Sequence, residues 1–403
     1  MSNYDVGIIG AGVAGAFATL KLAKDHKNAK TILFDIGRPP AKRRRQLEGW
    51  LGCLPNSDGK LYLSDLDKIT PLVGLRKAKS AYNWTSKILS NVDIFKIIKD
   101  RSPMVSLDKK FRKAGYEIFL NNYLQIYPKD VHLLSKLMAE TIERNKNITF
   151  KFDSEVVRVR RERNGFMVQT EEESHFCKKI IVAVGRSGWR WAHQLFSHFG
   201  IIDNNDIARF GIRIETNSSN MKDLNKSSCT IIKGADLELG PFSWHGTVIP
   251  EDHLDLAIST FRSNERRWKS DKVSFNLIGN RTFPGTGFEQ TNRIGGLSFV
   301  LSNDRIIKER VSSILSDKSK ISIIPEYEWL KGVLEELGSI VPEIISKAYF
   351  YVPTITPLAS KINIGDDLST EVNGMFVAGE STGVSGILSA ACTGIIAADS
   401  VCK

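Results

Sequence analysis

The hydrophobic pattern of residues 1–36 predicts a strand, a tight turn, a helix and a second strand. Val6–Ile9 is a short apolar run typical of a buried strand. Small and apolar residues from Ala14 to Lys24 recur at helical spacing, and Thr31–Asp35 has the β-branched and aromatic content of a second strand. Because strands joined by one helix run parallel, we predict a parallel sheet here.

The middle of the chain has a different pattern. Between about 200 and 320, short alternating runs (FGIRIET, CTIIKG, HGTVIP, LDLAIST, GGLSFVL) predict a mainly antiparallel sheet. The pattern over Tyr327–Lys347 predicts helical structure, and Met375–Val401 returns to a strand followed by a small-residue helix. We therefore predict an α/β fold in which a Rossmann-like domain, a parallel sheet with helices, is interrupted by an inserted antiparallel domain.

Composition shifts place the domain boundaries. We assign the discontinuous Rossmann-like domain to residues 1–70, 126–195 and 360–403. Residues 71–125 form an expected helical insertion, and residues 196–359 form the antiparallel domain, which we expect to bind substrate.

The glycines between the first strand and helix point to a dinucleotide. In GAGVAG, Gly10 permits a tight turn, Gly12 lets a pyrophosphate approach the backbone, and Gly15 lets helix and strand pack closely. The helix N-terminus supplies N–H groups for phosphate. Asp35, at the end of the second strand, suits the adenosine ribose hydroxyls and disfavours a 2′-phosphate.

Composition narrows the cellular context. The chain has 403 residues, 42% hydrophobic and 25% charged, as in ordinary globular proteins. It has neither an apolar run of about 18 residues nor a basic, signal-like start, so we predict no membrane span and no secretion. Five scattered cysteines without CxxC spacing predict a cytoplasmic protein without disulfides or a metal site.

The formal charge of +11 leaves two interpretations open. Basic clusters lie at Lys42–Arg45, Arg158–Arg163 and Arg262–Lys272. They form either a solvated basic surface or a surface that attracts an anionic partner such as nucleic acid. No nucleic-acid module is recognisable to decide between them.

The C-terminal stretch NGMFVAGESTGVSGILSAA resembles the closing motif of glutathione-reductase-type flavoproteins, which implies FAD as the cofactor. In that group an acidic residue after glycine binds the ribitol, and the next helix points its N-terminus at the flavin N1/C2 carbonyl edge. The resemblance implies these roles for Glu380 and for the amides of Gly386 and Ile387. Such a helix end would stabilise a reduced flavin.

The resemblance continues through the chain. IIVAVGRSG resembles the second dinucleotide motif of the group, at Ala183, Val184 and Gly185, with adenine contacts implied near Val156 and Val157. The chain also resembles a set of uncharacterised bacterial FAD-dependent dehydrogenases, which carry three of its motifs in the same order. These motifs are NSDGKL, VAVGRSG followed by FGIRIE, and AGE…GVSGILSAA. Those dehydrogenases look like distant relatives of geranylgeranyl reductases and of the flavoproteins that modify tRNA wobble uridines.

The match spans about residues 5–65, 130–215 and 370–400, and departs over about 220–350. It therefore implies fold and cofactor rather than reaction. One of the arginines at positions 43–45 is expected to pair with the pyrophosphate. The predicted FAD-binding residues are Gly10, Gly12, Val13, Ala14, Gly15, Asp35, Ile36, Arg43, Arg44, Val157, Ala183, Gly185, Gly379, Glu380, Ser385, Gly386 and Ile387.

Two residues are candidates for catalysis. Lys60, in a loop that the resemblance brings near the isoalloxazine, could polarise N5 or bind an anionic substrate; the alternative is a surface turn. His245, in FSWHGT, could transfer protons beside a stacked flat substrate; the alternative is a structural histidine. Cys53 has no CxxC partner, which argues against a disulfide reductase.

These observations predict an FAD-dependent oxidoreductase that moves hydride or electrons between flavin and a small or base-linked substrate. Three alternatives stay open: amine oxidation or a lyase step on a modified DNA or tRNA base, a non-catalytic flavin-binding or sensory protein, and saturation of isoprenoid double bonds. No second GxGxxG follows a strand, so we expect no dedicated NAD(P)H domain.

Overall fold

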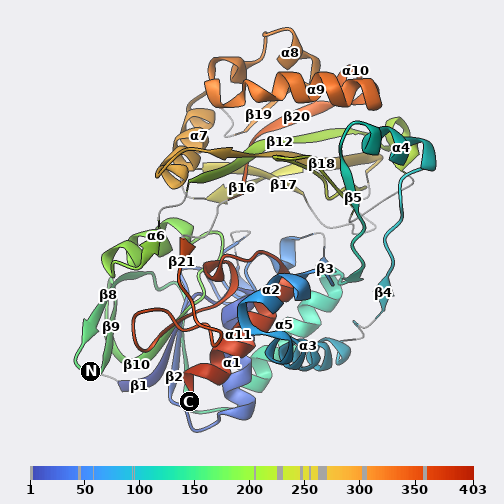
Figure 1. Cartoon of the computed structure of the whole chain (residues 1–403). Helices are drawn as coiled ribbons and strands as arrows, with labels where there is room; N and C mark the ends of the chain where they lie inside the picture. The colour runs from blue at the N-terminus through green and yellow to red at the C-terminus, as the bar shows by residue number, and fades with distance from the viewer. Residues whose placement is uncertain are drawn as a thin grey trace. The chain divides into compact units, whose positions relative to one another are not determined.

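Two sheets of different kinds organise the chain, one in each of two units (Figure 1). The computed structural model describes residues 3–43, 47–57, 59–92, 94, 96–203, 206–224, 230–245, 248–253, 256–261, 270–301, 306–356 and 361–403. Unit 1 comprises Met1–Lys96, Leu124–Asn204 and Leu358–Lys403, and unit 2 comprises Ile97–Tyr123 and Asn205–Pro357. The segment 71–125, expected as a separate insertion, is thus divided between the two units.

The described residues of unit 1 form a seven-stranded sheet in the order β7-β2-β1-β10-β9-β8, with β22 also paired to β10. The pairs β7–β2, β2–β1, β1–β10 and β10–β22 are parallel, and β8 and β9 are antiparallel. The strands are β1 (Asn3–Ile9), β2 (Thr31–Phe34), β7 (Ile148–Lys151), β8 (Val156–Glu162), β9 (Gly165–Thr170), β10 (Ser174–Val182) and β22 (Met375–Val377). The predicted parallel sheet is confirmed.

Helices cover both faces of this sheet. Ile8 and Ile181 pack with the helices on one face, whereas Ile9 and Ile180 face α6 and the β8–β9 hairpin, because side chains alternate along a strand. The helices are α1 (Val13–Asp25), α2 (Asp65–Val73), α3 (Leu75–Ser90), α5 (Pro128–Glu143), α6 (Trp189–His198) and α11 (Ile387–Val401).

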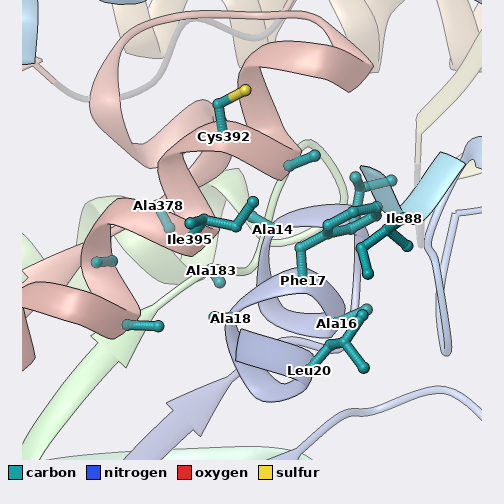
Figure 2. Close-up of a cluster of buried hydrophobic side chains, with 14 of the residues drawn as sticks. Ala14, Ala16, Phe17, Ala18, Leu20, Ile88, Ala183, Ala378, Cys392 and Ile395 are labelled. Atoms are coloured by element: carbon teal, nitrogen blue, oxygen red, sulfur yellow. The ribbon is translucent and has the colours of Figure 1, made fainter. Parts of the chain in front are cut away.

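The core on the α1 side joins the two ends of the chain. Figure 2 shows Ala14 and Phe17 of α1, Ile88 of α3, and Cys392 and Ile395 of α11 in one buried cluster. The two helices α1 and α11 pack along each other. Small residues on both allow this close approach, which is why the C-terminal helix belongs to the first unit of the fold.

Shorter elements connect these layers. They are η1 (Pro40–Lys42), η2 (Leu54–Asn56), β3 (Lys60–Tyr62), β6 (Tyr123–Gln125, whose first residue falls in unit 2), β11 (Ile202–Asp203), β21 (Lys361–Ile362) and η7 (Gly379–Thr382).

Unit 2 contains the antiparallel sheet that the alternating runs predict, but the run GGLSFVL is not part of it: these residues end the helix α7 (Gly287–Leu301). Its order is β19-β20-β12-β18-β14-β13-β5, with β15 also on β18. The longest pairing joins β12 to β18. The strands of unit 2 are β4 (Ile97–Ile98), β5 (Glu117–Phe119), β12 (Ile207–Asn217), β13 (Ile231–Lys233), β14 (Leu237–Leu239), β15 (Ser243–Trp244), β16 (Val248–His253), β17 (Leu256–Phe261), β18 (Lys272–Thr282), β19 (Ile307–Arg310) and β20 (Tyr349–Thr356).

One face of this sheet is apolar and carries helices. Phe210 of β12 is fully buried against the rings of Tyr327 and Trp329. The helices of unit 2 are α4 (Val105–Lys113), η3 (Ser218–Leu224), α7 (Gly287–Leu301), α8 (Ser312–Leu315), η5 (Lys320–Ile323), η6 (Pro325–Tyr327), α9 (Trp329–Ile340) and α10 (Glu343–Ser346).

The helical character predicted for Tyr327–Lys347 is confirmed, and the chain forms two helices there, α9 and α10. Val341, between them, has φ −134° and ψ 84°. Pro342 explains the break, because the residue before a proline is pushed out of the helical region.

The described residues include no helix long and apolar enough to cross a membrane. They also include no group of three His, Cys, Asp or Glu side chains that could hold a metal ion. Cys177, Cys392 and Cys402 form no disulfide bond within the described chain.

Candidate dinucleotide site

The turn between β1 and α1 contains two glycines that the fold itself requires. Gly10 has φ +102°, and a Cβ on it would lie 2.5 Å from the Ala183 carbonyl oxygen. A Cβ on Gly15 would overlap the Gly10 carbonyl oxygen. Gly12 differs: it has φ −60°, and no heavy atom of the described chain lies within 4 Å of its Cβ position. The backbone at Gly12 is therefore open to a ligand at the N-terminus of α1.

Asp35 ties the end of β2 to this turn. Its Oδ2 accepts a hydrogen bond from the Ala11 amide at 2.5 Å, and its Oδ1 accepts from the amides of Gly37 at 2.7 Å and Gly49 at 2.8 Å. Burial raises the pKa of Asp35, and the three backbone donors oppose that rise. A carboxylate oxygen has two lone pairs, so Oδ2 retains capacity for a ribose hydroxyl.

The segment 49–53, which sequence reasoning considered only for its Cys53 thiol, lies over the same turn. The Leu51 amide donates to the Ala11 carbonyl at 2.9 Å, and a Cβ on Gly52 would lie 3.2 Å from the Gly12 Cα. Gly49, Leu51 and Gly52 have φ of +86°, +62° and +51°. The two glycines in GWLGC are the available signal, since each marks a left-handed backbone position.

Arg43 holds this segment in place. Its guanidinium donates to the carbonyl oxygens of Trp50 and Gly52, both at 2.6 Å. Burial lowers the pKa of Arg43, and the neighbouring Cys53 and Asp35 oppose that shift. Its role toward a pyrophosphate stays a prediction. Arg44, predicted beside it, lies outside the described residues.

The ends of three parallel strands meet at this turn. The Ala183 amide donates to the Ile9 carbonyl at 2.8 Å, and the Ala378 amide donates to the Val182 carbonyl at 2.9 Å. Gly379, with φ +67°, would place a Cβ 3.0 Å from that of Ala14. The connections that follow β1 and β10 lead to helices on opposite faces of the sheet, α1 and α6. Open α/β sheets form their ligand crevice at such a point.

Two further predicted residues flank this edge. Val13 is the first residue of α1 and is 6% exposed. Gly185 has φ +60°, and no heavy atom of the described chain lies within 4 Å of its Cβ position. The backbone at Gly185, like that at Gly12, is accessible for a close contact.

Glu380 has a carboxylate oxygen without a donor. Its Oε2 is buried and accepts no hydrogen bond from the residues that the structure describes. Its Oε1 lies 3.6 Å from an Arg186 guanidinium nitrogen. Leaving a buried acceptor unsatisfied costs about 1–3 kcal/mol, so a ligand hydroxyl bound here would recover that energy.

A carboxylate of the chain itself lies at the N-terminus of α11. The Asp65 side chain is fully buried, with Oδ2 3.5 Å from the Ser389 amide and Oδ1 2.8 Å from Lys68 Nζ. A Cβ on Gly386 would overlap this carboxyl group. Burial raises the pKa of Asp65, and Lys68 opposes that rise.

This arrangement changes the expected environment of the flavin edge. Gly386 and Ile387 begin a helix whose positive end is already partly neutralised by Asp65. Lys68 returns a positive charge, since its Nζ also lies 3.3 Å from the carbonyl oxygen of Ser385. Sequence reasoning missed both residues, because nothing in their own segment indicates a contact with α11.

The expected adenine contact at Val157 lies at the start of β8, and Ile36, another predicted FAD-binding residue, follows the end of β2. Ile36 is 39% exposed and Val157 is 47% exposed. Val157 lies at a shift in the register of β8 on β9, so its backbone is outside the regular ladder. The neighbouring Val156 carbonyl accepts a hydrogen bond from Trp191 Nε1 at 2.6 Å.

Lys60 begins β3 in unit 1 and is only 6% exposed. The preceding Gly59 has φ +68°, and its carbonyl accepts from the Ile126 amide at 2.8 Å. β3 packs against α11. This burial excludes the alternative of a solvent-exposed turn, and the catalytic role of Lys60 stays a prediction.

His245 lies in unit 2, in a turn with φ +63°. Its amide donates to the Lys272 carbonyl at 2.7 Å, and its ring Nδ1 lies 2.8 Å from the Ser270 carbonyl oxygen. A carbonyl oxygen only accepts, so Nδ1 carries the proton and Nε2 is the nitrogen for proton exchange. The tethered ring fits a structural role, and proton transfer stays a prediction.

Comparisons with known proteins find similar folds only. No protein-family model matches the chain, and no curated protein matches it. Glycine oxidase from Geobacillus kaustophilus is 14% identical with a TM-score of 0.46, over 100% of this chain and 95% of that one. L-proline dehydrogenase from P. horikoshii is 13% identical with a TM-score of 0.44, over 98% and 91%.

CtdE, solved in complex with FAD, is 11% identical with a TM-score of 0.39, over 98% of this chain and 82% of that one. Identities this low leave the functional assignment to the residues of this chain.

Proposed function

We propose that this protein is an FAD-dependent oxidoreductase that transfers hydride or electrons between flavin and a small or base-linked substrate. The observation that carries the proposal is the unsatisfied Oε2 of Glu380 at the same strand edge as the open backbone of Gly12. When bound, FAD supplies the redox chemistry, and the protein supplies position and electrostatics.

The residues present fit the parts of FAD. Gly12 and the N-terminus of α1 would hold the pyrophosphate, and Asp35 Oδ2 would accept from the adenosine ribose. Glu380 Oε2 would accept from a ribitol hydroxyl, which satisfies its buried lone pairs. The β10 and β22 strand ends bring Glu380 to the glycine turn although it lies far away in the sequence.

The first experiment measures flavin directly. The purified protein is expected to carry or take up FAD, identified after extraction by its absorbance and mass. In Gly12→Val the new side chain enters open space, so the melting temperature should stay within about 2 °C. FAD affinity should fall at least about tenfold, because the side chain occupies the place of the pyrophosphate.

Gly296→Val, in α7 of unit 2, is the matched control. Its Cβ also meets no heavy atom of the described chain within 4 Å, and it should bind FAD like the wild type. A wild-type protein that takes up no FAD contradicts the proposed function.

Turnover separates an oxidoreductase from a non-catalytic flavin-binding or sensory protein. An anaerobic screen of small molecules and modified bases should reveal a compound that bleaches the bound flavin. Adding dioxygen or an artificial electron acceptor should then reoxidise the flavin, and the cycle should repeat many times while that compound is present. Lys60→Met is expected to slow that bleaching while FAD content stays unchanged. Bleaching that never repeats would favour a sensory role.

A further inference from the structure

The antiparallel sheet of unit 2 has two chemically different faces. Along β12, Phe210, Ile212 and Ile214 are fully buried on the helix-covered face. Arg213 and Glu215 alternate with them and point to the opposite face. These two charged side chains are nevertheless only 4% and 8% exposed.

Strand register extends this polar character across the sheet. Arg213 pairs with Asn276 of β18 and Tyr351 of β20, and Glu215 pairs with Ser274 and Tyr349 of the same strands. Residues directly opposite in an antiparallel pair share a face. We call the resulting group the polar face: Arg213, Glu215, Ser274, Asn276, Tyr349 and Tyr351.

Two groups on the polar face lack hydrogen-bond partners within the described chain. The Ser274 side chain is 1% exposed and its Oγ is unsatisfied, as is the buried Oδ1 of Asn276. Glu215 accepts from the Tyr351 hydroxyl at 2.9 Å. Buried polar groups in native proteins are normally satisfied by protein, water or ligand, so Ser274 and Asn276 point to a ligand on this face.

The charges of the polar face favour an anion. Besides Arg213, the neighbouring edge strand β19 brings Lys308 to 5.3 Å from the Tyr351 ring and Arg310 to 4.4 Å from the Tyr349 ring. Glu215 is the carboxylate among them. A guanidinium matches the two oxygens of a carboxylate better than an ammonium does, so Arg213 is suited to bind that group.

We propose that the polar face binds a small carboxylate that also carries an amine or hydroxyl group. Arg213 pairs with the carboxylate, and Asn276 Oδ1 and Glu215 accept hydrogen bonds from the amine or hydroxyl. The Ser274 hydroxyl, opposite Glu215 on β18, accepts from the same group. Arg213 and Glu215 are two residues apart, which separates them by about 7 Å along the strand, the length of a small bifunctional molecule. The claim that this ligand is the substrate rests on the proposed function. The claim that the polar face binds the ligand does not depend on it.

Calorimetric titration of the full-length protein tests the proposal. The probes are the standard L-amino acids, L-lactate and malate, each beside its carboxamide. At least one carboxylate should bind, and its amide should not. Arg213→Met should weaken that binding by about 10- to 100-fold, as expected for a hydrogen bond to a charged group.

Arg209→Met is the matched control. Arg209 lies on the same strand and face, four positions from Arg213 and so about 13 Å away along the strand, beyond the reach of a ligand about 7 Å long. Its ion pair with Glu238, at 3.3 Å, makes it a charged residue of comparable kind, and this variant should bind within about twofold of the wild type. No binding of any carboxylate, or equal weakening in both arginine variants, overturns the proposal.

Ser274→Ala provides a second variant that keeps the fold. The hydroxyl has no partner in the described chain, so its removal should leave the melting temperature unchanged or higher while weakening the ligand about three- to tenfold. If water alone occupied the polar face, Ser274→Ala would keep or raise the melting temperature without weakening ligand binding. That outcome overturns the proposal.

Titrations with and without FAD separate the two proposals. A protein that takes up no FAD but binds a carboxylate through Arg213 contradicts only the proposed function. A protein that holds FAD but binds no carboxylate contradicts only the inference about the polar face.

Discussion

At the residue scale, Glu380 is a half-buried acid whose buried Oε2 accepts no hydrogen bond from the described residues. Glu380→Ala is therefore expected to leave the flavin-free protein as stable as the wild type or more so. FAD affinity should fall about tenfold through the lost hydrogen bond to ribitol. Flavin fluorescence quenching measures the affinity, and the exposed Glu172→Gln serves as control. Equal losses in both variants would contradict the role of Glu380.

Asp35 shows how one side chain links structure to pH. Asp35→Asn leaves a single oxygen for three backbone donors, which should lower the free energy of unfolding by about 1–3 kcal/mol. Burial raises the folded-state pKa of Asp35, so its protonation favours the folded state. That contribution is fully present below the unfolded value of 3.8 and is lost as pH rises through the folded pKa.

The difference in stability between wild type and Asp35→Asn should therefore be largest near pH 4 and smaller at higher pH. Urea unfolding across this range measures it. A difference that grows with pH would show that the backbone donors, rather than burial, dominate the pKa of Asp35.

At the element scale, the packing of α11 on α1 depends on Gly394. A Cβ there would overlap the Ala14 carbonyl oxygen, so Gly394→Ala is expected to force the helices apart. Overpacking of this kind costs about 1–3 kcal/mol. Gly332→Ala in α9 meets no heavy atom of the described chain within 4 Å and should instead stabilise by about 0.5–1 kcal/mol. Thermal unfolding that shows the same sign for both variants would contradict the packing argument.

At the scale of the whole molecule, the net charge of +11 predicts salt-sensitive attraction to polyanions. Fluorescently labelled tRNA and duplex DNA should bind at about 50 mM salt and lose about a hundredfold or more in affinity by about 200 mM. Replacing the exposed Arg158 and Arg160 of β8 with glutamate should reduce the salt dependence. Absence of binding at low salt would leave the charge as a solvated surface and remove the nucleic-acid alternative.

Much of the fold could be predicted because its signals are local. The strand, glycine turn and helix over residues 3–25 follow from apolar periodicity and from the spacing of Gly10 and Gly15. Both signals can be recognised within this short segment, without knowledge of a distant partner. The antiparallel character of unit 2 follows from short alternating runs. The helical structure over Tyr327–Lys347 also follows from local periodicity, and Pro342 is the local signal that divides it into α9 and α10.

The sequence by itself therefore determined the dinucleotide turn and the two kinds of sheet, because these depend on backbone preference and periodicity within short segments. Only the tertiary structure decided which distant residues complete each site. The loop with Gly52 lies over Gly12, Asp65 reaches the end of α11 across 324 positions, and strand register sets Arg213 beside Asn276. Such contacts arise from packing and strand pairing between remote segments, and no single segment carries a record of its partner.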